Sequence, residues 1–231
     1  MPTPSAPARS RAVAGVSSAA GAVLRGAFAG LGRLRPTDKP LHPRGVVLAA
    51  TVHRFGSPER FGVPWLDEPG ADPALVRLSR GGGLPAALPD VLGIGLRVDP
   101  DDRPGDLLFA TTGRGPVGRF LLRPRRASTL AAATYSTLQP YRTPTGPVVL
   151  AATPEPDRER TVLRLAAARP TGRWQPFGTV VLERAQPGAA ATDRPISFDP
   201  FLHPVPGLEN YGWTRRLREG AYAAARRTRR R

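Results

Sequence analysis

An arginine and a tyrosine near the carboxyl end of the chain have the types and the spacing to form a reactive pair. Arg218 and Tyr222 lie four residues apart, in a stretch whose small apolar residues repeat with helical spacing, so on a helix they are surface neighbours. A guanidinium beside a phenol favours the phenolate. A phenolate on a helix can bind ferric haem iron. The pattern therefore offers Tyr222 as an iron ligand; the alternative is an amphipathic surface helix whose arginine lies near a tyrosine by coincidence.

The three histidines are the other candidates for proton transfer. His42 precedes a proline, which by itself indicates a surface-loop histidine, whereas His53 and His203 are interpreted as structural. The chain has no cysteine, which excludes disulfides, zinc–thiolate sites, iron–sulfur clusters and cysteine nucleophiles. No metal-ligand spacing stands out, and no Gly-x-Ser-x-Gly motif offers a hydrolase nucleophile.

Composition limits the fold that can position these groups. The chain has 231 residues, of which 40% are hydrophobic, enough for one sizeable domain with a core. The 28 prolines and 25 glycines favour a loop-rich β or α+β fold over a helix bundle. Net charge is +16, and Lys39 is the single lysine. A surface of this kind attracts nucleic acid, anionic lipid or acidic ligands nonspecifically.

The amino-terminal region differs in composition from the rest. The first 37 residues contain no acid, which in a eukaryote would resemble a mitochondrial transit peptide. We predict that residues 1–34 form a tail and an Ala/Gly-rich arm helix, and that residues 35–231 form one domain. No apolar run has the roughly 18–20 residues of a membrane span, and a cytoplasmic location is the default prediction.

Short β-branched and apolar runs, separated by glycine and proline, predict many strands. The expected strands are residues 45–53 (buried on both faces), 74–79, 91–98, 106–112, 117–122, 146–152, 161–168, 178–183 and, more weakly, 195–198. Helices are expected at residues 10–34, 126–137 and 213–228. Residues 79–83 are interpreted as a barrel turn, with a phosphate-cradling turn as the alternative. Together these elements predict an α+β fold, an antiparallel β-barrel with flanking helices.

Several short segments, taken in order along the chain, resemble the haem-containing catalases, and particularly the small catalase-like proteins reduced to the barrel core. The matching segments are Lys39-Pro-Leu-His42-Pro-Arg-Gly45, Val76-Arg-Leu-Ser79, Asp90–Val98, Asp106-Leu-Leu108, Thr134–Arg142, Phe198-Asp-Pro with Val205-Pro-Gly207, and Arg218-x-x-x-Tyr222. Each is short, but their order and spacing extend over residues 39–222.

The resemblance implies a b-type haem and a role for each matching residue. Tyr222 would be the axial ligand of the iron and Arg218 its charge partner. His42 would be the distal acid/base, supported by Ser79. Two cations would meet the haem propionates, Arg77 as a bidentate anchor and Lys39 as a weaker point charge. Tyrosine and histidine would then face each other across a flat slot inside a strand-walled cavity.

The sequence also departs from the catalase pattern. The family has a distal asparagine that orients the peroxide, where this chain has Ala110 and Thr111. Thr111 is the candidate for hydrogen bonding to peroxide in its place. Ala224 replaces the acid that follows the family's proximal tyrosine. The resulting prediction is a haem-binding protein with weak peroxidase or catalase activity on hydrogen or organic peroxide, with homo-oligomerisation left open. The alternative is a haem-free catalase fold that serves as a binding or scaffold module for an anionic partner.

Overall fold

The structure is a computed structural model that describes residues 45–82, 84–85, 87–99, 102–126, 133–155, 161–183 and 196–214. Four of the predicted site residues, Lys39, His42, Arg218 and Tyr222, lie outside these ranges. The predicted arm helix also lies outside them. Residues 212–214 are helical, and the rest of the predicted carboxyl-terminal helix is not covered. The domain boundary at residue 35 therefore stays a prediction.

Besides the helical residues 212–214, the described part of the chain contains ten strands and two short helical segments. They are β1 (Gly45–Phe55), α2 (Pro64–Asp67), β2 (Pro69–Arg80), β3 (Leu92–Val98), β4 (Gly105–Thr112), the 3₁₀ turn η1 (Gly118–Phe120), β5 (Thr134–Ser136), β6 (Tyr141–Thr143), β7 (Gly146–Glu155), β8 (Thr161–Ala168), β9 (Gln175–Leu182) and β10 (Glu209–Asn210). No helix in these ranges is long and apolar enough to cross a bilayer.

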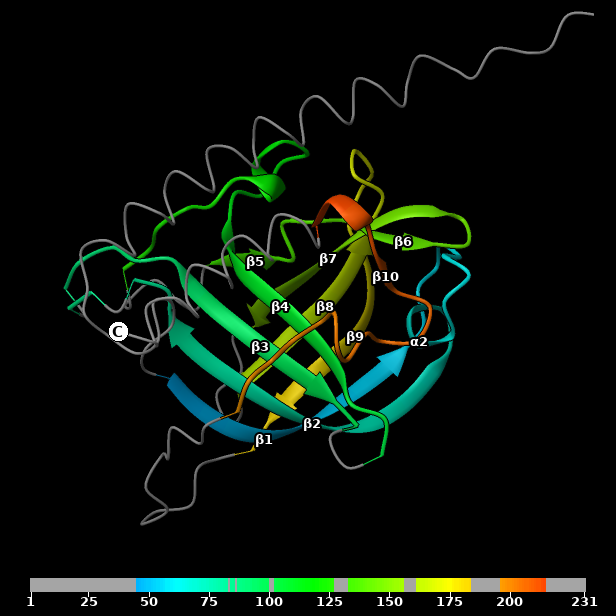
Figure 1. The fold of residues 1–231 in the computed structure, drawn as a ribbon, viewed down its shortest axis with the longest axis horizontal. Helices are drawn as coiled ribbons and strands as arrows, with labels where there is room; N and C mark the ends of the chain where they lie inside the picture. Colours follow the sequence, from blue (N-terminus) through cyan, green and yellow to red (C-terminus); the bar gives the residue numbers. More distant parts are fainter. Residues whose placement is uncertain are drawn as a thin grey trace, which may run out of the picture. The chain divides into compact units, whose positions relative to one another are not determined.

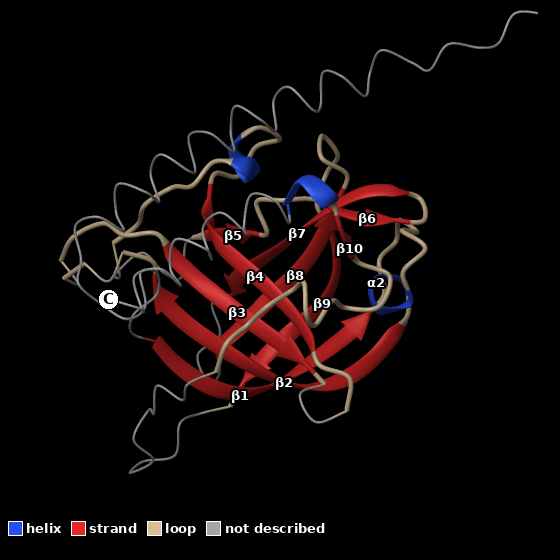
Figure 2. Ribbon diagram, in the orientation of Figure 1, coloured by secondary structure: helices blue, strands red, loops and turns tan. Residues whose placement is uncertain are grey.

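Eight of the strands close into an antiparallel barrel (Figures 1 and 2). The order around it is β7-β5-β4-β3-β2-β1-β9-β8, and β8 pairs back with β7 to complete the ring. β6 and β10 extend from β7 as a small side sheet. Closure leaves the barrel strands without a long free edge. The predicted antiparallel β-barrel is thus confirmed.

The inside of the barrel is filled by its own side chains. Alternate residues of each strand point inward, and residues such as Val52, Val76, Leu96 and Phe177 are at most 1% exposed and belong to one apolar cluster. A barrel of eight strands is just wide enough for its side chains to fill it. The prediction of a flat, ring-sized slot inside the barrel is therefore wrong. A flat ligand of that size would have to lie outside the strands.

Seven of the predicted strands are present, as β1–β4 and β7–β9, with ends that differ by a few residues. Three other predicted elements are wrong. Residues 117–122 contain the 3₁₀ turn η1 in place of a strand, residues 134–136 form β5 in place of a helix, and residues 196–198 join no strand ladder. β1 is also not buried on both faces, because only Ala50 and Val52 of its residues are fully buried.

A backbone turn around Asp67 shapes the connection between β1 and β2. The Asp67 carboxylate, 8% exposed, accepts hydrogen bonds from the backbone N–H groups of residues 61–63 at 2.7–3.1 Å. These bonds satisfy donors that precede α2 and have no partner of their own in so short a helix. The turn places the Phe61 side chain, which is 0% exposed, in the core cluster.

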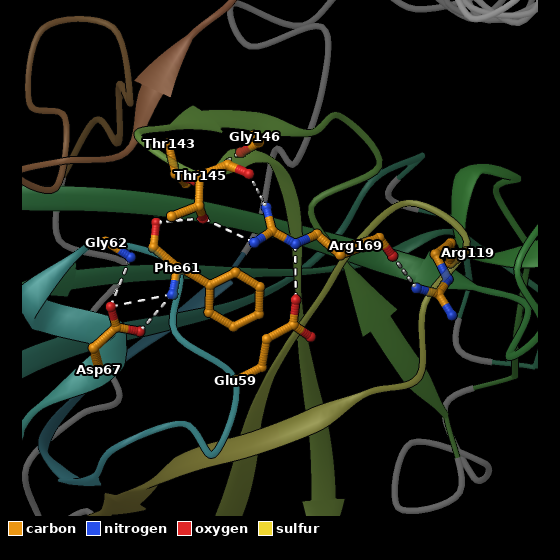
Figure 3. A network of polar contacts seen from close by, with 9 residues as sticks. All are labelled: Glu59, Phe61, Gly62, Asp67, Arg119, Thr143, Thr145, Gly146 and Arg169. Carbon is orange, nitrogen blue, oxygen red and sulfur yellow. Dashed lines mark hydrogen bonds and ion pairs between the residues drawn. The ribbon is translucent and has the colours of Figure 1, made fainter. Parts of the chain in front are cut away.

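Arg169 joins this connection to two other turns (Figure 3). Its Nε donates to Glu59 Oε1 at 2.8 Å, and its Nη1 donates to the carbonyl of Thr145 at 2.8 Å. The Thr145 hydroxyl donates to the carbonyl of Phe61 at 2.9 Å, and the Arg169 guanidinium lies 5.0 Å from the Phe61 ring. These contacts hold the β6–β7 and β8–β9 turns against Phe61.

Tyr135 on β5 gives the barrel a dependence on alkaline pH. The side chain is 2% exposed, and burial raises its pKa well above the ordinary value. In the unfolded chain tyrosine loses its proton near about pH 10, so above that pH the unfolded state binds fewer protons than the folded state. The free energy of unfolding should fall with rising pH, by up to about 1.4 kcal/mol per pH unit.

Tyr135→Phe should remove most of this slope, measured by urea unfolding from neutral to alkaline pH. Tyr211→Phe is the matched control, because Tyr211 is only partly buried and its pKa is raised less strongly. An equal slope in the wild-type and Tyr135→Phe proteins would contradict the assignment.

Candidate functional site

The two predicted site residues on β2 lie on the outer face of the barrel. Val76 and Leu78 point into the core, so Arg77 and Ser79, which alternate with them, point outward. Arg77 is nevertheless only 9% exposed, and Ser79 is half-buried. The structure therefore brings Arg77 and Ser79 together on one covered outer surface.

A row of small residues crosses this outer face from strand to strand. Strand register places Gly45 of β1 opposite Ser79, Ser79 opposite Gly93 of β3, Gly93 opposite Ala110 of β4, and Ala110 opposite Ser136 of β5. The strands are about 4.8 Å apart, and no member of this small-residue row has more than two side-chain heavy atoms. The side chains of the row are therefore low, and Arg77 lies beside Ser79 on the same face of β2. Ser136, at the end of the row, is 0% exposed, and its hydroxyl donates to the carbonyl of Arg119.

Arg77 lies against the backbone where β1 begins. A Cβ added to Gly45 would lie 2.8 Å from the Arg77 Cζ atom and 2.8 Å from the Leu78 carbonyl oxygen. The backbone oxygen cannot move away as a flexible side chain can, so glycine is required for this approach. Arg77 thus lies against Gly45, and Gly45 is three positions after His42 in the sequence.

A buried ion pair lies farther along the same outer face. Arg97 donates from Nε and Nη2 to the two carboxylate oxygens of Asp106, each at 2.7 Å. The Asp106 side chain is 0% exposed and that of Arg97 is 18% exposed. The hydrogen bond to Asp106 raises the pKa of Arg97 by more than partial burial lowers it. Two parallel bonds of this kind fix geometry as well as charge.

The ion pair fastens the segment 196–208 (orange in Figure 1) to the outer face. Arg97 donates to the carbonyl of Ser197 at 2.9 Å, and Asp106 accepts from the backbone N–H of Asp199 at 2.7 Å. The Phe198 ring lies on Gly95, where an added Cβ would come within 3.1 Å of it. The chain that leads toward Tyr222 therefore crosses the surface that carries Arg77 and Ser79.

The Thr111 side chain points into the barrel, away from this outer face. It shares the inner face with Phe109, is 0% exposed, and accepts a hydrogen bond from the backbone N–H of Leu92 at 3.2 Å. Its neighbour Ala110 is the residue that faces outward in the small-residue row. The structure does not bring Thr111 to the other candidates, because adjacent strand residues point to opposite faces.

The other chemical candidates are structural in the part of the chain that is described. In the turn after β2, the backbone N–H groups of Gly82 and Leu84 donate to the Asp90 carboxylate at 2.7 and 3.1 Å. The turn cradles a carboxylate of its own chain, which excludes the phosphate-cradling alternative. His53 is exposed, and the carbonyl of His203 accepts from the Asp106 N–H. No cluster of metal-binding side chains occurs among these residues.

Two features of the site were missed from the sequence, namely the Arg97–Asp106 pair and the close approach of Arg77 to Gly45. A signal for the pair was present, because Arg97 and Asp106 flank a Pro- and Asp-rich turn at positions that face each other in a hairpin. No sequence signal marks the approach of Arg77 to Gly45, since it depends on strand register.

No protein-family model matches the sequence, and no curated protein matches it. Solved structures of catalases are among those similar to this chain. Catalase A from Saccharomyces cerevisiae has a TM-score of 0.55 at 12% identity, over 87% of this chain and 63% of the catalase. A fungal catalase has a TM-score of 0.53 at 12% identity, over 82% of this chain and 58% of the catalase. This chain thus spans about three-fifths of the length of these catalases. At such low identity the likeness concerns architecture alone: the chain has a catalase-like β-barrel fold.

Proposed function

We propose that this protein binds one b-type haem against the outer face of β1–β4 and reacts weakly with hydrogen or organic peroxides. The observation that carries the proposal is the gathering of Arg77, Ser79 and the segment 196–208 on one outer face of a catalase-like barrel. The residues come from two separate segments that matched the catalase pattern in the sequence.

The described residues fit a flat, anionic ring. The small-residue row has no bulky side chain that would obstruct a planar group. Arg77 supplies a planar fork of donors suited to a carboxylate such as a haem propionate, and the missing side chain of Gly45 leaves room for that fork beside the backbone. Arg77 is the propionate anchor in this proposal, and Lys39 is a second cation for the same purpose.

The proton chemistry is assigned to His42. His42 lies three positions before Gly45 in the sequence, so the two Cα atoms are at most about 11 Å apart, and Arg77 lies against Gly45. From there an imidazole can accept a proton from a bound peroxide and return it. Ser79, on the same outer face, is the supporting hydroxyl. Tyr222 is the iron ligand and Arg218 keeps its phenolate charged; haem, when bound, supplies the redox chemistry.

The activity should be weak because Ala110 has no hydrogen-bonding group. Ala110 faces outward beside Gly93 in the small-residue row, where its methyl group can neither donate nor accept a hydrogen bond. A peroxide there would be oriented by His42 alone. A cytoplasmic location and a homo-oligomeric assembly remain predictions from the sequence.

A haemin titration followed by visible spectroscopy tests this function. The wild-type protein should take up one haemin and give a tyrosinate-type spectrum, and Tyr222→Phe should abolish that spectrum. Tyr211→Phe, a partly buried tyrosine outside the site, is the control and should leave it unchanged. Arg77→Gln should weaken haemin binding by about ten- to a hundredfold, as expected for a lost hydrogen bond to a charged group. A protein that takes up no haemin would refute the proposal.

A haem-free barrel that binds an anionic partner is the second candidate function. The net charge of +16 and the alanine at position 110 favour it. Salt-sensitive binding to an anionic matrix, without any Soret band after haemin treatment, would support this candidate over the first.

A further inference from the structure

The loop that follows β4 exposes a compact apolar tip. Residues 116–121 include η1, and within them Val117 is 73% exposed and Leu121 is 54% exposed. Phe120 between them is partly exposed. Single exposed apolar side chains are ordinary, but here three lie within five residues. We call residues 116–121 the apolar tip.

The apolar tip is held in a defined shape by its backbone. Gly113 N–H donates to Gly118 O, Arg119 N–H to Gly115 O, and Leu121 N–H to Gly118 O, each at 3.0 Å. Gly113 and Gly118 approach so closely that a Cβ on Gly113 would lie 3.0 Å from the Gly118 Cα. A loop that is already ordered loses little conformational entropy when it binds a partner.

A buried arginine anchors the apolar tip to the barrel (Figure 3). Arg119 is 2% exposed, donates to the carbonyls of Arg169 and Gly172 at 3.1 and 2.8 Å, and lies 4.2 Å from the Trp174 ring. Its Nε has no hydrogen-bond partner, and no carboxylate pairs with it in the described part of the chain. Burial lowers its pKa. Two carbonyl acceptors and the Trp174 ring hold the Arg119 guanidinium, and with it the apolar tip, against the barrel.

The surroundings of the apolar tip are strongly basic. Residues 113–126 contain five arginines and no acid, and Arg114, Arg123 and Arg126 are exposed. Arg173 is exposed on the turn that Arg119 contacts. Aliphatic side chains thus project from a surface of positive charge.

We propose that the apolar tip docks the protein on a bilayer that contains anionic phospholipid, with Val117 and Leu121 in the interfacial layer and the neighbouring arginines on headgroup phosphates. Apolar groups flanked by arginines are the combination that an anionic membrane surface recognises. Nucleic acid would satisfy the arginines through its phosphates, but it offers no apolar phase to valine or leucine. The proposal does not depend on haem binding.

The absence of cysteine permits a local test that general electrostatic attraction cannot imitate. A single cysteine placed by Val117→Cys in the full chain would carry an environment-sensitive fluorophore. Its emission should shift to the blue, and be quenched by a lipid-borne quencher, with vesicles of equal parts phosphatidylcholine and phosphatidylglycerol but not with phosphatidylcholine alone. Leu202→Cys is the matched control: Leu202 is also 73% exposed, and it lies near the opposite end of β4. No shift is expected for that label.

Vesicle sedimentation provides the second measurement. Arg123→Gln should weaken binding about fivefold, the value expected for one arginine at an anionic surface, whereas Arg103→Gln at the other end of β4 should not. Val117→Ser with Leu121→Ser should also weaken binding, whereas Leu202→Ser should not. Equal shifts from the labels at positions 117 and 202, or binding to RNA with no shift on anionic vesicles, would overturn the proposal.

Discussion

Asp106→Asn should lower the free energy of unfolding by about 3 kcal/mol, which is the lower end of the range for breaking a buried ion pair. The substitution keeps the size of the side chain but leaves the Arg97 guanidinium without its carboxylate. The lower end applies because the Arg97 side chain remains 18% exposed and water can reach it. The backbone N–H of Asp199 also loses its charged acceptor.

The matched control is Asp72→Asn, which breaks the Arg54–Asp72 pair. That pair has a similar distance of 2.8 Å, but both of its side chains are partly exposed, at 13% and 21%. Solvent screens such pairs, so we expect a loss of about 1 kcal/mol. Urea unfolding followed by tryptophan fluorescence compares the two variants. Equal losses would show that burial of the Arg97–Asp106 pair does not set its contribution.

Limited proteolysis gives a second readout for Asp106→Asn. The segment 196–208 is held by the ion pair through Ser197 and Asp199. Its loosening should raise the rate of cleavage within that segment before the barrel unfolds. Asp72→Asn should not change this rate, because Asp72 is on β2, away from the segment.

The strands of the barrel could be predicted from the sequence where they are long enough to form a clear apolar run. β8, for example, is eight residues long and mostly apolar, and its limits were predicted without error. β5 and β6 have three residues each, which is too short to show a period. They are strands because longer neighbours pair with them. Residues 117–122 are apolar enough for a strand, yet they contain the turn η1, in which the Arg119 side chain is buried.

The site was predictable only in part, and for a related reason. The spacing of Arg77 and Ser79 was sufficient to place them on one face of β2. Their alignment with Gly45, Gly93 and Ala110 depends on register between four strands, which the sequence does not show. Register also decides that Ala110 faces the site while Thr111 faces the core.

Because Ala110 and Thr111 point to opposite faces of β4, the substitution Ala110→Asn is predicted to have the greatest functional effect. The asparagine amide would project from the small-residue row on the face that carries Ser79 and Arg77. There it can donate a hydrogen bond to a peroxide as charge develops on the departing oxygen. A single placed donor of this kind contributes about a hundredfold to turnover. Haemin-loaded Ala110→Asn should therefore evolve oxygen from hydrogen peroxide about a hundredfold faster than the haemin-loaded wild-type protein.

Thr111→Asn is the control. It introduces the same amide one residue further along β4, on the inner face, and so tests whether the effect depends on the face that carries the amide. Thr111 is 0% exposed and its hydroxyl accepts from the Leu92 N–H. The larger amide should destabilise the barrel by about 1–3 kcal/mol and give no gain in turnover. If Ala110→Asn keeps the haemin spectrum but shows no faster turnover, the outer face at position 110 is not where peroxide is held. In that case haem binding would stand, and the distal side of the ring would have to be assigned to a different part of the small-residue row.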